Sequence, residues 1–272
     1  MRPNALILPD SLVPTLKHFT VIRQPAFLDL ALSSLSRFNN LETLSLYWVP
    51  MQGNGFQQMK GKMKSLKKLN LRRCFNLTST GFHHLTLNLG HLKCLELKGL
   101  HQIDRESIRL LSRANQLEDL SLRCSRLIID DEGLTDLEFL ANMRLKRLEL
   151  IDAIGLTAAG IKKLVDTQEF TLESLTLSDC HLIHVGDLLP LRRLKKLRDL
   201  QIMHAVHLGP DDENLQYKMK PGGGVEFLIS PEEEANLIRL PHPARLAAGD
   251  QNDPIDVEFD DPQVPVPYLL LQ

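Results

Sequence analysis

LETLSL, residues 41–46, is the clearest copy of a six-residue phrase that recurs along this chain and decides its fold. The phrase is leucine, two variable residues, leucine, one variable residue and an aliphatic residue. The other copies are LKHFTV (16–21, the weakest), LKKLNL (66–71), LKCLEL (92–97), LEDLSL (117–122), LKRLEL (145–150), LESLTL (172–177) and LRDLQI (197–202). Their starts are separated by 25, 25, 26, 25, 28, 27 and 25 residues. A period of this size predicts a solenoid in which each copy buries its apolar face against the next.

Each repeat reads as a strand, a tight turn and a helix when its first leucine is numbered position 1. Positions 4 and 6 point to one face of an extended strand, so they are expected in the core. The strands should centre on position 4: Phe19, Leu44, Leu69, Leu95, Leu120, Leu148, Leu175 and Leu200. A small residue at position 9, such as Cys74 or Cys180, suits the turn. Position 13 offers helix N-cap residues in Thr78, Asp104 and Thr157.

Two phrases connect the repeat to a known family. RRCFNLTSTGFHHL (72–85) and LIDAIGLTAAGIKKL (150–164) resemble the cysteine-containing leucine-rich repeat. Over about residues 16–204 the chain is similar to the repeat half of F-box/leucine-rich-repeat proteins. The resemblance implies an α/β right-handed horseshoe, with parallel strands on the concave face and helices on the convex face.

The resemblance also implies a function. It is that of the substrate-recognition component of an F-box (SCF-type) ubiquitin ligase, whose chemistry lies in other subunits. An F-box would precede the first repeat, and 15 residues precede Leu16, without a visible F-box. Contact with a ligase adaptor and cullin is therefore expected only through an F-box that this sequence does not show. The alternative is a leucine-rich-repeat scaffold or adaptor without a ligase role.

Charge divides the chain into a repeat domain and a tail. Residues 1–204 hold 28 Lys and Arg against 21 Asp and Glu, and residues 205–272 hold 4 against 13. The net charges are therefore +7 and −9. We expect residues 1–15 to form an N-terminal edge segment, with Leu6, Ile7, Leu8, Leu12 and Val13 covering the open edge. Residues 16–204 form the repeat domain, and 205–272 an irregular, acidic, proline-rich tail.

Composition limits the function classes. The N-terminus lacks a signal peptide, no run approaches the ~18 apolar residues of a membrane span, and no cysteine has a C-x-x-C partner. These features predict a protein of the cytoplasm or nucleus with reduced thiols and no membrane partner. Cys74 and Cys180 are expected to be buried, and Cys94 more accessible. Cys180, His181 and His184 lack the further ligands of a zinc site. No catalytic motif is visible, so neither an enzyme nor a cofactor is predicted.

The candidate binding residues lie on the sheet positions that point to solvent. Position 7 stacks three cations, Arg72, Lys98 and Arg123, in consecutive copies beside Tyr47, with Trp48 at position 8. Lys68 and Arg147 occupy position 3. One interpretation is a concave protein-binding site for an acidic or phosphorylated segment of a substrate protein. The other is a solvated face in which Glu96, Asp119 and Glu149 pair with the cations.

Two further hypotheses concern the basic repeats. Nucleic-acid binding is disfavoured, because acidic residues are interspersed and the two aromatics stand without other stacking platforms. The acidic tail segments PEEE (231–234) and DVEFDD (256–261) could instead fold back and mask the basic surface. A disordered tail that only aids solubility is the alternative. The glycines at 222–224 lack the lysine of a phosphate loop and predict a turn or linker.

Overall fold

The computed structural model describes residues 8–100, 102–103, 105–123, 133–153, 155–180, 182–203, 217–220, 223–227 and 268–271. Asp104, Cys124, His181 and most of 204–267 lie outside these ranges.

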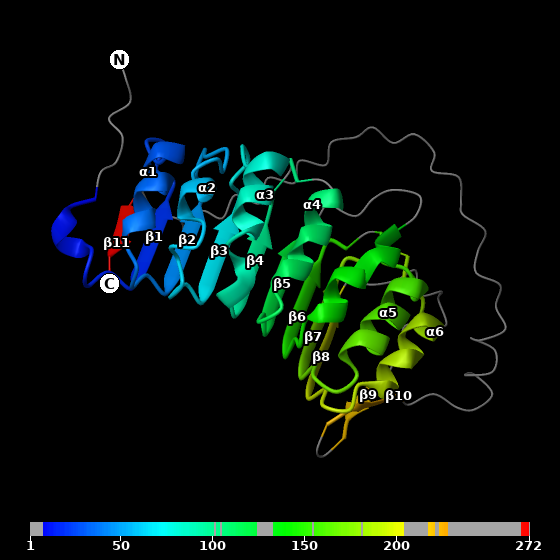
Figure 1. Cartoon of the computed structure of the whole chain (residues 1–272). Helices are drawn as coiled ribbons and strands as arrows, with labels where there is room; N and C mark the ends of the chain where they lie inside the picture. The colour runs from blue at the N-terminus through cyan, green and yellow to red at the C-terminus, as the bar shows by residue number, and fades with distance from the viewer. Residues whose placement is uncertain are drawn as a thin grey trace, which may run out of the picture.

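Eight of the described strands form one parallel sheet in chain order (Figure 1). They are β1 (His18–Ile22), β2 (Thr43–Tyr47), β3 (Lys68–Arg72), β4 (Cys94–Lys98), β5 (Asp119–Arg123), β6 (Arg147–Ile151), β7 (Ser174–Ser178) and β8 (Asp199–Met203). The register joins Phe19 to Leu44 and continues without a slip to Leu200. The predicted strand centres are therefore confirmed, and the chain is an α/β leucine-rich-repeat solenoid.

Short helices lie along one side of this sheet (Figure 1). The α-helices are α1 (Asp29–Ser34), α2 (Phe56–Met59), α3 (Ser79–Thr86), α4 (Arg105–Arg109), α5 (Ala158–Gln168) and α6 (Val185–Leu188). The 3-10 helices are η1 (Asp10–Leu12), η2 (Leu35–Arg37), η3 (Leu89–His91), η4 (Leu110–Arg113), η5 (Gly133–Asn142) and η6 (Leu189–Arg193). Thr78 caps α3 as predicted, because its hydroxyl accepts from the Gly81 N–H at 3.0 Å. Thr157 precedes α5 but makes no capping hydrogen bond.

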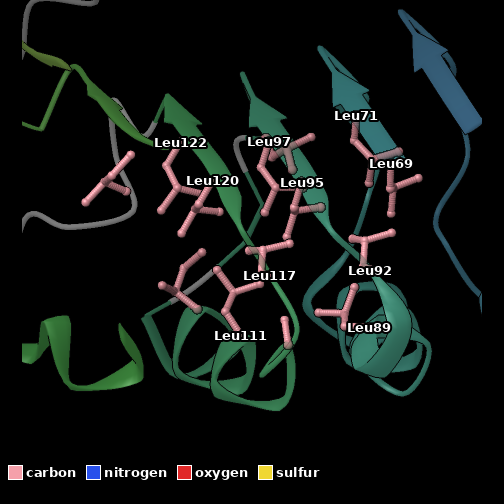
Figure 2. Close-up of a cluster of buried hydrophobic side chains, with 14 of the residues drawn as sticks. Leu69, Leu71, Leu89, Leu92, Leu95, Leu97, Leu111, Leu117, Leu120 and Leu122 are labelled. Atoms are coloured by element: carbon pink, nitrogen blue, oxygen red, sulfur yellow. The ribbon is translucent and has the colours of Figure 1, made fainter. Parts of the chain in front are cut away.

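The core is the layer of leucines between strands and helices. Figure 2 shows position-4 and position-6 leucines of three neighbouring strands pointing toward leucines of the helical side. Leu69, Leu71 and Leu111, for example, have no exposed surface. Burying a leucine side chain contributes about 1.5–3 kcal/mol, so repetition of this layer supplies most of the stabilisation.

Position 8 turns the chain out of each strand through a left-handed backbone conformation. Its φ values are 49° at Arg23, 53° at Trp48, 53° at Arg73, 63° at Gly99, 54° at Asp152 and 56° at Asp179. Several of these residues donate their N–H to the position-7 carbonyl of the next repeat, as Trp48 does to Arg72 at 2.9 Å. The turn then places position 9 inside, where Cys74 and Cys180 are buried as predicted.

The irregular second repeat is held by Asp29 of the first. The Asp29 carboxylate accepts hydrogen bonds from the N–H groups of Gly53, Gln52 and Gly55 at 2.8, 3.1 and 3.1 Å. Gly53 has a φ of 91°, which a side chain rarely adopts. Gly81 packs so closely that a Cβ would lie 2.0 Å from the Gln52 carbonyl oxygen. This short loop therefore requires both glycines.

The N-terminal edge of the sheet is covered from both ends of the chain. Leu8 is buried, and Leu12 and Val13 pack against the core. β11 (Tyr268–Leu271) pairs antiparallel with β1 and adds a ninth strand to the sheet. Packing of these three residues against the core agrees with the expected edge segment, which stays a prediction for residues 1–15 as a whole. Leu6 and Ile7 lie outside the described part.

The prediction of an irregular tail is wrong for three segments. β9 (Tyr217–Met219) and β10 (Val225–Phe227) form a hairpin, and β11 joins the main sheet. Gly223 and Gly224, with φ of 111° and 96°, lie in the turn between β9 and β10, as predicted. Val225 is fully buried, and Gly224 donates to the Leu197 carbonyl at 2.5 Å. Pairing with β1 stabilises β11, whereas β9 and β10 pair with each other and contact the solenoid through Val225 and the Gly224 hydrogen bond. A local sequence pattern does not reveal such long-range contacts.

Candidate functional site

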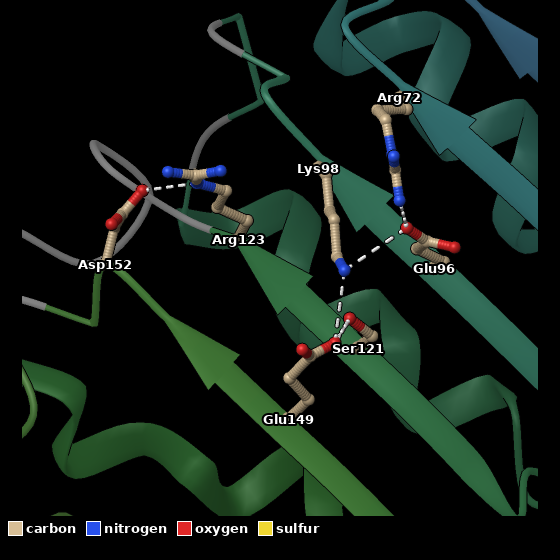
Figure 3. Close-up of polar contacts among 7 residues, drawn as sticks. All are labelled: Arg72, Glu96, Lys98, Ser121, Arg123, Glu149 and Asp152. Carbon is tan, nitrogen blue, oxygen red and sulfur yellow. Dashed lines mark hydrogen bonds and ion pairs between the residues drawn. The ribbon is translucent and has the colours of Figure 1, made fainter. Parts of the chain in front are cut away.

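The open face of the sheet, opposite the helices, carries the predicted cationic column. Arg72, Lys98 and Arg123 project from the ends of β3, β4 and β5 (Figure 3). Arg72 donates to Glu96 at 2.6 Å, and the Lys98 ammonium lies 3.3 Å from the same carboxylate. A carboxylate of the chain itself therefore bridges the first two cations.

This network of ion pairs, which we call the lattice, continues over strands β5 and β6. Lys98 also lies 3.2 Å from Glu149, which accepts a hydrogen bond from the Ser121 hydroxyl. Arg123 donates to Asp152 at 2.8 Å (Figure 3). All three cations of the column are thus paired within the chain, as the solvated-face interpretation expects. Asp152 was not anticipated, because it lies at position 8 rather than on a strand.

The pKa of Glu96 reflects this lattice. Burial alone would raise it, but the hydrogen bond from Arg72 and the charges of Lys98 and Arg72 outweigh burial. The pKa of Glu96 is therefore held below its ordinary value of 4.5. The carboxylate stays charged at neutral pH and keeps the column locally neutral.

A cleft of about 360 Å³ opens beside this lattice on the open face. It is lined by Lys68, Asn70, Cys94, Leu95, Glu96, Asp119, Leu120, Ser121, Arg147, Leu148, Glu149, Ser174 and Thr176. Arg147 is ion-paired with Asp119, which also accepts from the Cys94 thiol at 3.1 Å. Lys68 forms no ion pair with any carboxylate in the described ranges. The cleft therefore brings together Lys68 and Arg147 but includes neither Tyr47 nor Trp48.

Tyr47 and Trp48 belong to a separate cluster at the rim where the strands end. The Arg72 guanidinium lies 5.6 Å from the Tyr47 ring centre. Trp48 lies between Arg23 and Arg73, whose guanidinium carbons are 4.9 and 5.4 Å from its ring centre. Such distances are those of cation–π contacts. The predicted site residues therefore form two separate groups. One is the cationic column with the cleft beside it, and the other is the cluster of Tyr47 and Trp48 at the rim.

The thiols lie as predicted. Burial raises the pKa of Cys74 and of Cys180 to about 12 in each case. Cys94 is half-buried, and burial followed by the hydrogen bond and charge of Asp119 raises its pKa to about 11. These three thiols are therefore poor nucleophiles at neutral pH. Within the described ranges, no three His, Cys, Asp or Glu side chains gather as a metal site.

Two arrangements escaped sequence interpretation. Position 2 carries ion-paired triads, in which Glu42 lies 3.7 and 2.8 Å from Lys17 and Lys67. A second triad places Glu118 between Lys146 and Lys93, whose hydrogen bonds lower its pKa to about 2. The alternation of Lys and Glu down this column was the available signal.

The second is Gln168, which is fully buried at the end of α5. Its amide nitrogen donates to the carbonyls of Leu140 and Met143 at 2.9 and 3.3 Å, and its oxygen accepts from the Leu145 N–H at 3.1 Å. These hydrogen bonds of Gln168 hold the segment that follows η5 against α5. A single glutamine in a helix gives no sequence signal for this role.

No helix in the part of the chain that the structure describes is long and apolar enough to cross a membrane.

Comparison with known proteins gives structural matches only. No protein-family model and no curated protein matches the chain. Among solved structures, internalin C2 of Listeria monocytogenes is 17% identical, with a TM-score of 0.44 over 73% of this chain and 76% of that one. The leucine-rich-repeat domain of the type III effector XopL is 20% identical, with a TM-score of 0.43 over 72% of each chain.

A third match is a chain of the yeast Rad7–Elc1 complex. It is 17% identical, with a TM-score of 0.36 over 70% of this chain and 64% of that one. The fold assignment rests on the unbroken register of β1 to β8, independently of these matches. By that register the chain has the fold of a leucine-rich-repeat solenoid.

Proposed function

We propose that the chain is a protein-interaction module that receives a segment of a partner protein on the open face of its sheet. The cleft over β3 to β7 supports this proposal, because it presents charged groups of both signs and hydroxyl groups on a rigid, repetitive scaffold. A rigid surface of paired charges loses little conformational entropy on binding, so specificity can come from how well a partner matches the charges.

The expected partner segment is polar and extended. Lys68 is the cation of the cleft that has no described acidic partner, and it favours an acidic or phosphorylated group on the ligand. The other charges of the cleft are already paired, so they select a partner of matching polarity and add little affinity.

A role as the substrate-recognition component of an F-box ligase is the finer form of this proposal. It rests on the resemblance of residues 72–85 and 150–164 to the cysteine-containing repeat. A scaffold or adaptor without ligase partners is the alternative. Affinity purification of the chain together with its own upstream coding sequence separates them, because adaptor and cullin-type subunits accompany only a ligase receptor.

The cleft is tested by filling it. Thr176→Arg places a long side chain among the lining residues, whereas Ala159→Arg adds the same side chain at an exposed position of α5. Partners identified by purification should be lost with Thr176→Arg and retained with Ala159→Arg. Retention by both variants would place the binding surface elsewhere.

A further inference from the structure

The excess positive charge of the solenoid lies in one stretch of the chain. Residues 43–95 contain eight Lys and Arg and no Asp or Glu, a net charge of +8. The other residues up to 204 contain 20 Lys and Arg against 21 Asp and Glu. Acidic residues are interspersed over the repeat domain as a whole, which disfavoured nucleic-acid binding, but they are missing from this stretch. A polyanion would therefore meet local positive charge without competing carboxylates of the same stretch.

Three lysines of this stretch project from one loop. The loop joins α2 to β3, at the edge of the sheet where the parallel strands begin (Figure 1). Its lysines, Lys60, Lys62 and Lys64, are all exposed. Among the described residues no carboxylate pairs with any of the three, whereas the following Lys67 is paired with Glu42 at 2.8 Å. We call residues 60–64 the lysine loop.

Buried methionines hold the lysine loop to the core. Met59 and Met63 are 1% and 4% exposed. The Lys62 N–H donates to the Met59 carbonyl at 2.9 Å, and Gly61 adopts a φ of 72°, which glycine tolerates without strain. Buried and exposed residues thus alternate within one tight turn. The lysines are therefore presented to solvent from an anchored backbone, and their side chains keep the freedom to reach a ligand.

The surface of this loop offers charge without apolar contact. No residue of 52–68, all of which the structure describes, is a large exposed hydrophobic residue. A protein interface has an apolar or aromatic centre, and stable attachment to a membrane takes an apolar anchor besides basic residues. Interfaces with nucleic acid are instead polar and strongly positive, and a lysine ammonium binds phosphate as a point charge. The chemistry of the loop therefore favours nucleic-acid phosphates over a protein or a lipid surface.

The residue types of the loop also indicate which form of nucleic acid it fits. Residues 60–64 include no aromatic side chain on which an unpaired base could stack. Contacts to phosphate position a protein on a duplex but do not read its base sequence. We propose that the lysine loop binds the phosphate backbone of duplex nucleic acid without preference for base sequence. The site is distinct from the cleft over β3 to β7 and does not depend on the function proposed for that cleft.

The proposal predicts a defined dependence on salt. Each phosphate that a lysine neutralises releases counterions, so three lysines contribute about 2.7 to the slope of log affinity against log salt concentration. Binding that lacks base contacts has a Kd of about 10⁻⁴–10⁻⁶ M at physiological salt, and we expect the full-length chain to fall in this range.

Fluorescence anisotropy of short labelled duplexes of two unrelated sequences measures both quantities. Lys60→Gln, Lys62→Gln and Lys64→Gln together should weaken binding at least about tenfold at low ionic strength and reduce the salt slope by about 3. Arginine at the same three positions keeps the charge and should keep the slope. Because the three side chains are exposed, both variants should unfold at the temperature of the wild type.

The matched control removes the same charge elsewhere on the solenoid. Lys162→Gln, Lys195→Gln and Lys196→Gln also replace exposed lysines that pair with no carboxylate in the described ranges. This variant should keep the affinity and the salt slope of the wild type. Equal weakening by the two glutamine variants would overturn the proposal, because net charge alone would then govern binding.

Competition identifies the partner class. Unlabelled duplex should displace the labelled duplex at a lower charge concentration than poly-glutamate or vesicles containing phosphatidylserine. Stronger displacement by either of these would assign the loop to an acidic protein or to a membrane and overturn the proposal. A more than about tenfold difference between the two duplex sequences would also contradict it, since phosphate contacts alone carry no base preference.

Discussion

The Lys98 ammonium lies 3.2 Å from the Glu149 carboxylate, although strand β5 separates the strands that carry these two residues. The contact runs over Ser121, which donates to the same carboxylate. Lys98→Met should therefore lower the free energy of unfolding by about 1 kcal/mol, because the pair is only partly exposed and well oriented. A double-mutant cycle with Glu149→Gln, measured by urea unfolding, should give a coupling of about 0.5–1 kcal/mol that decreases in high salt. If the two substitutions change the free energy of unfolding additively, the contact contributes nothing measurable to stability.

Glu96 should make the stability of the solenoid depend on pH. Its pKa is lower in the folded chain than the ordinary 4.5, so the folded state binds the proton less tightly. The resulting stabilisation is present above pH ~4.5 and is lost as the pH falls through the lower folded pKa. Glu96→Gln should cost about 1 kcal/mol at pH 7 and less at pH 3. The exposed Glu106→Gln serves as control and should change stability by less than about 0.5 kcal/mol at either pH.

Removing the carboxylate of Asp29 should destabilise the second repeat. Asp29→Ala leaves the N–H groups of Gln52, Gly53 and Gly55 without their acceptor, and hydrogen bonds to a charged group contribute about 1.5–3 kcal/mol each at most. Because water can replace part of this, we expect a loss of about 2–3 kcal/mol in urea unfolding. Asp29→Asn keeps one acceptor oxygen and should lose less. If Asp29→Ala and Asp29→Asn lower the free energy of unfolding equally, the negative charge of Asp29 is what stabilises the loop, and the acceptor oxygen kept by Asn does not.

The buried Gln168 should tolerate no apolar replacement. Gln168→Leu strands the Leu145 N–H and the carbonyls of Leu140 and Met143, so we expect a loss of about 2–4 kcal/mol. Thr171→Val removes only the hydroxyl that donates to Gln168 and should lose about 1 kcal/mol. Thermal unfolding followed by circular dichroism measures both. Similar effects for the two variants would contradict this ranking.

Thiol labelling should follow burial. In a Cys124→Ser background, Cys94 should react before Cys74 and Cys180, because it is half-buried and its pKa is about 11 rather than about 12. Asp119→Asn should raise the Cys94 rate at least about threefold, because loss of the carboxylate lowers the pKa of the thiol. Mass spectrometry of labelled peptides gives the order. Labelling of Cys180 ahead of Cys94 would contradict it.

The sequence predicted the fold better than the site, and the difference has a physical cause. Strand centres such as Leu95 follow from a short-range alternation, and each copy repeats the same packing solution. Side-chain pairing depends on register and rotamer across several strands. Sequence therefore named Glu96, Asp119 and Glu149 as possible partners of the cations. It could not show which carboxylate pairs with which cation, or that Arg123 turns toward Asp152.

Long-range strand pairing escaped sequence interpretation for the same reason. Residues 268–271 consist of one tyrosine and three leucines after a proline-rich stretch, and nothing local marks them as a partner of β1. The Asp29 contact with Gly53 likewise joins residues 24 positions apart. Contacts of this kind are set by the assembled solenoid, so they become visible only with its geometry.

The pairing of β11 with β1 has a consequence for biosynthesis. β1 leaves the ribosome before the seven strands that follow it in the sheet, and Tyr268 follows Ile22 by roughly 250 residues. At about 5–20 residues per second, the hydrogen-bonding edge of β1 waits tens of seconds for this partner. An unpaired edge strand is a template for aggregation. The nascent chain should thus depend on chaperones that shield its N-terminal edge during translation, even though the repeats that follow can fold one upon another as they emerge.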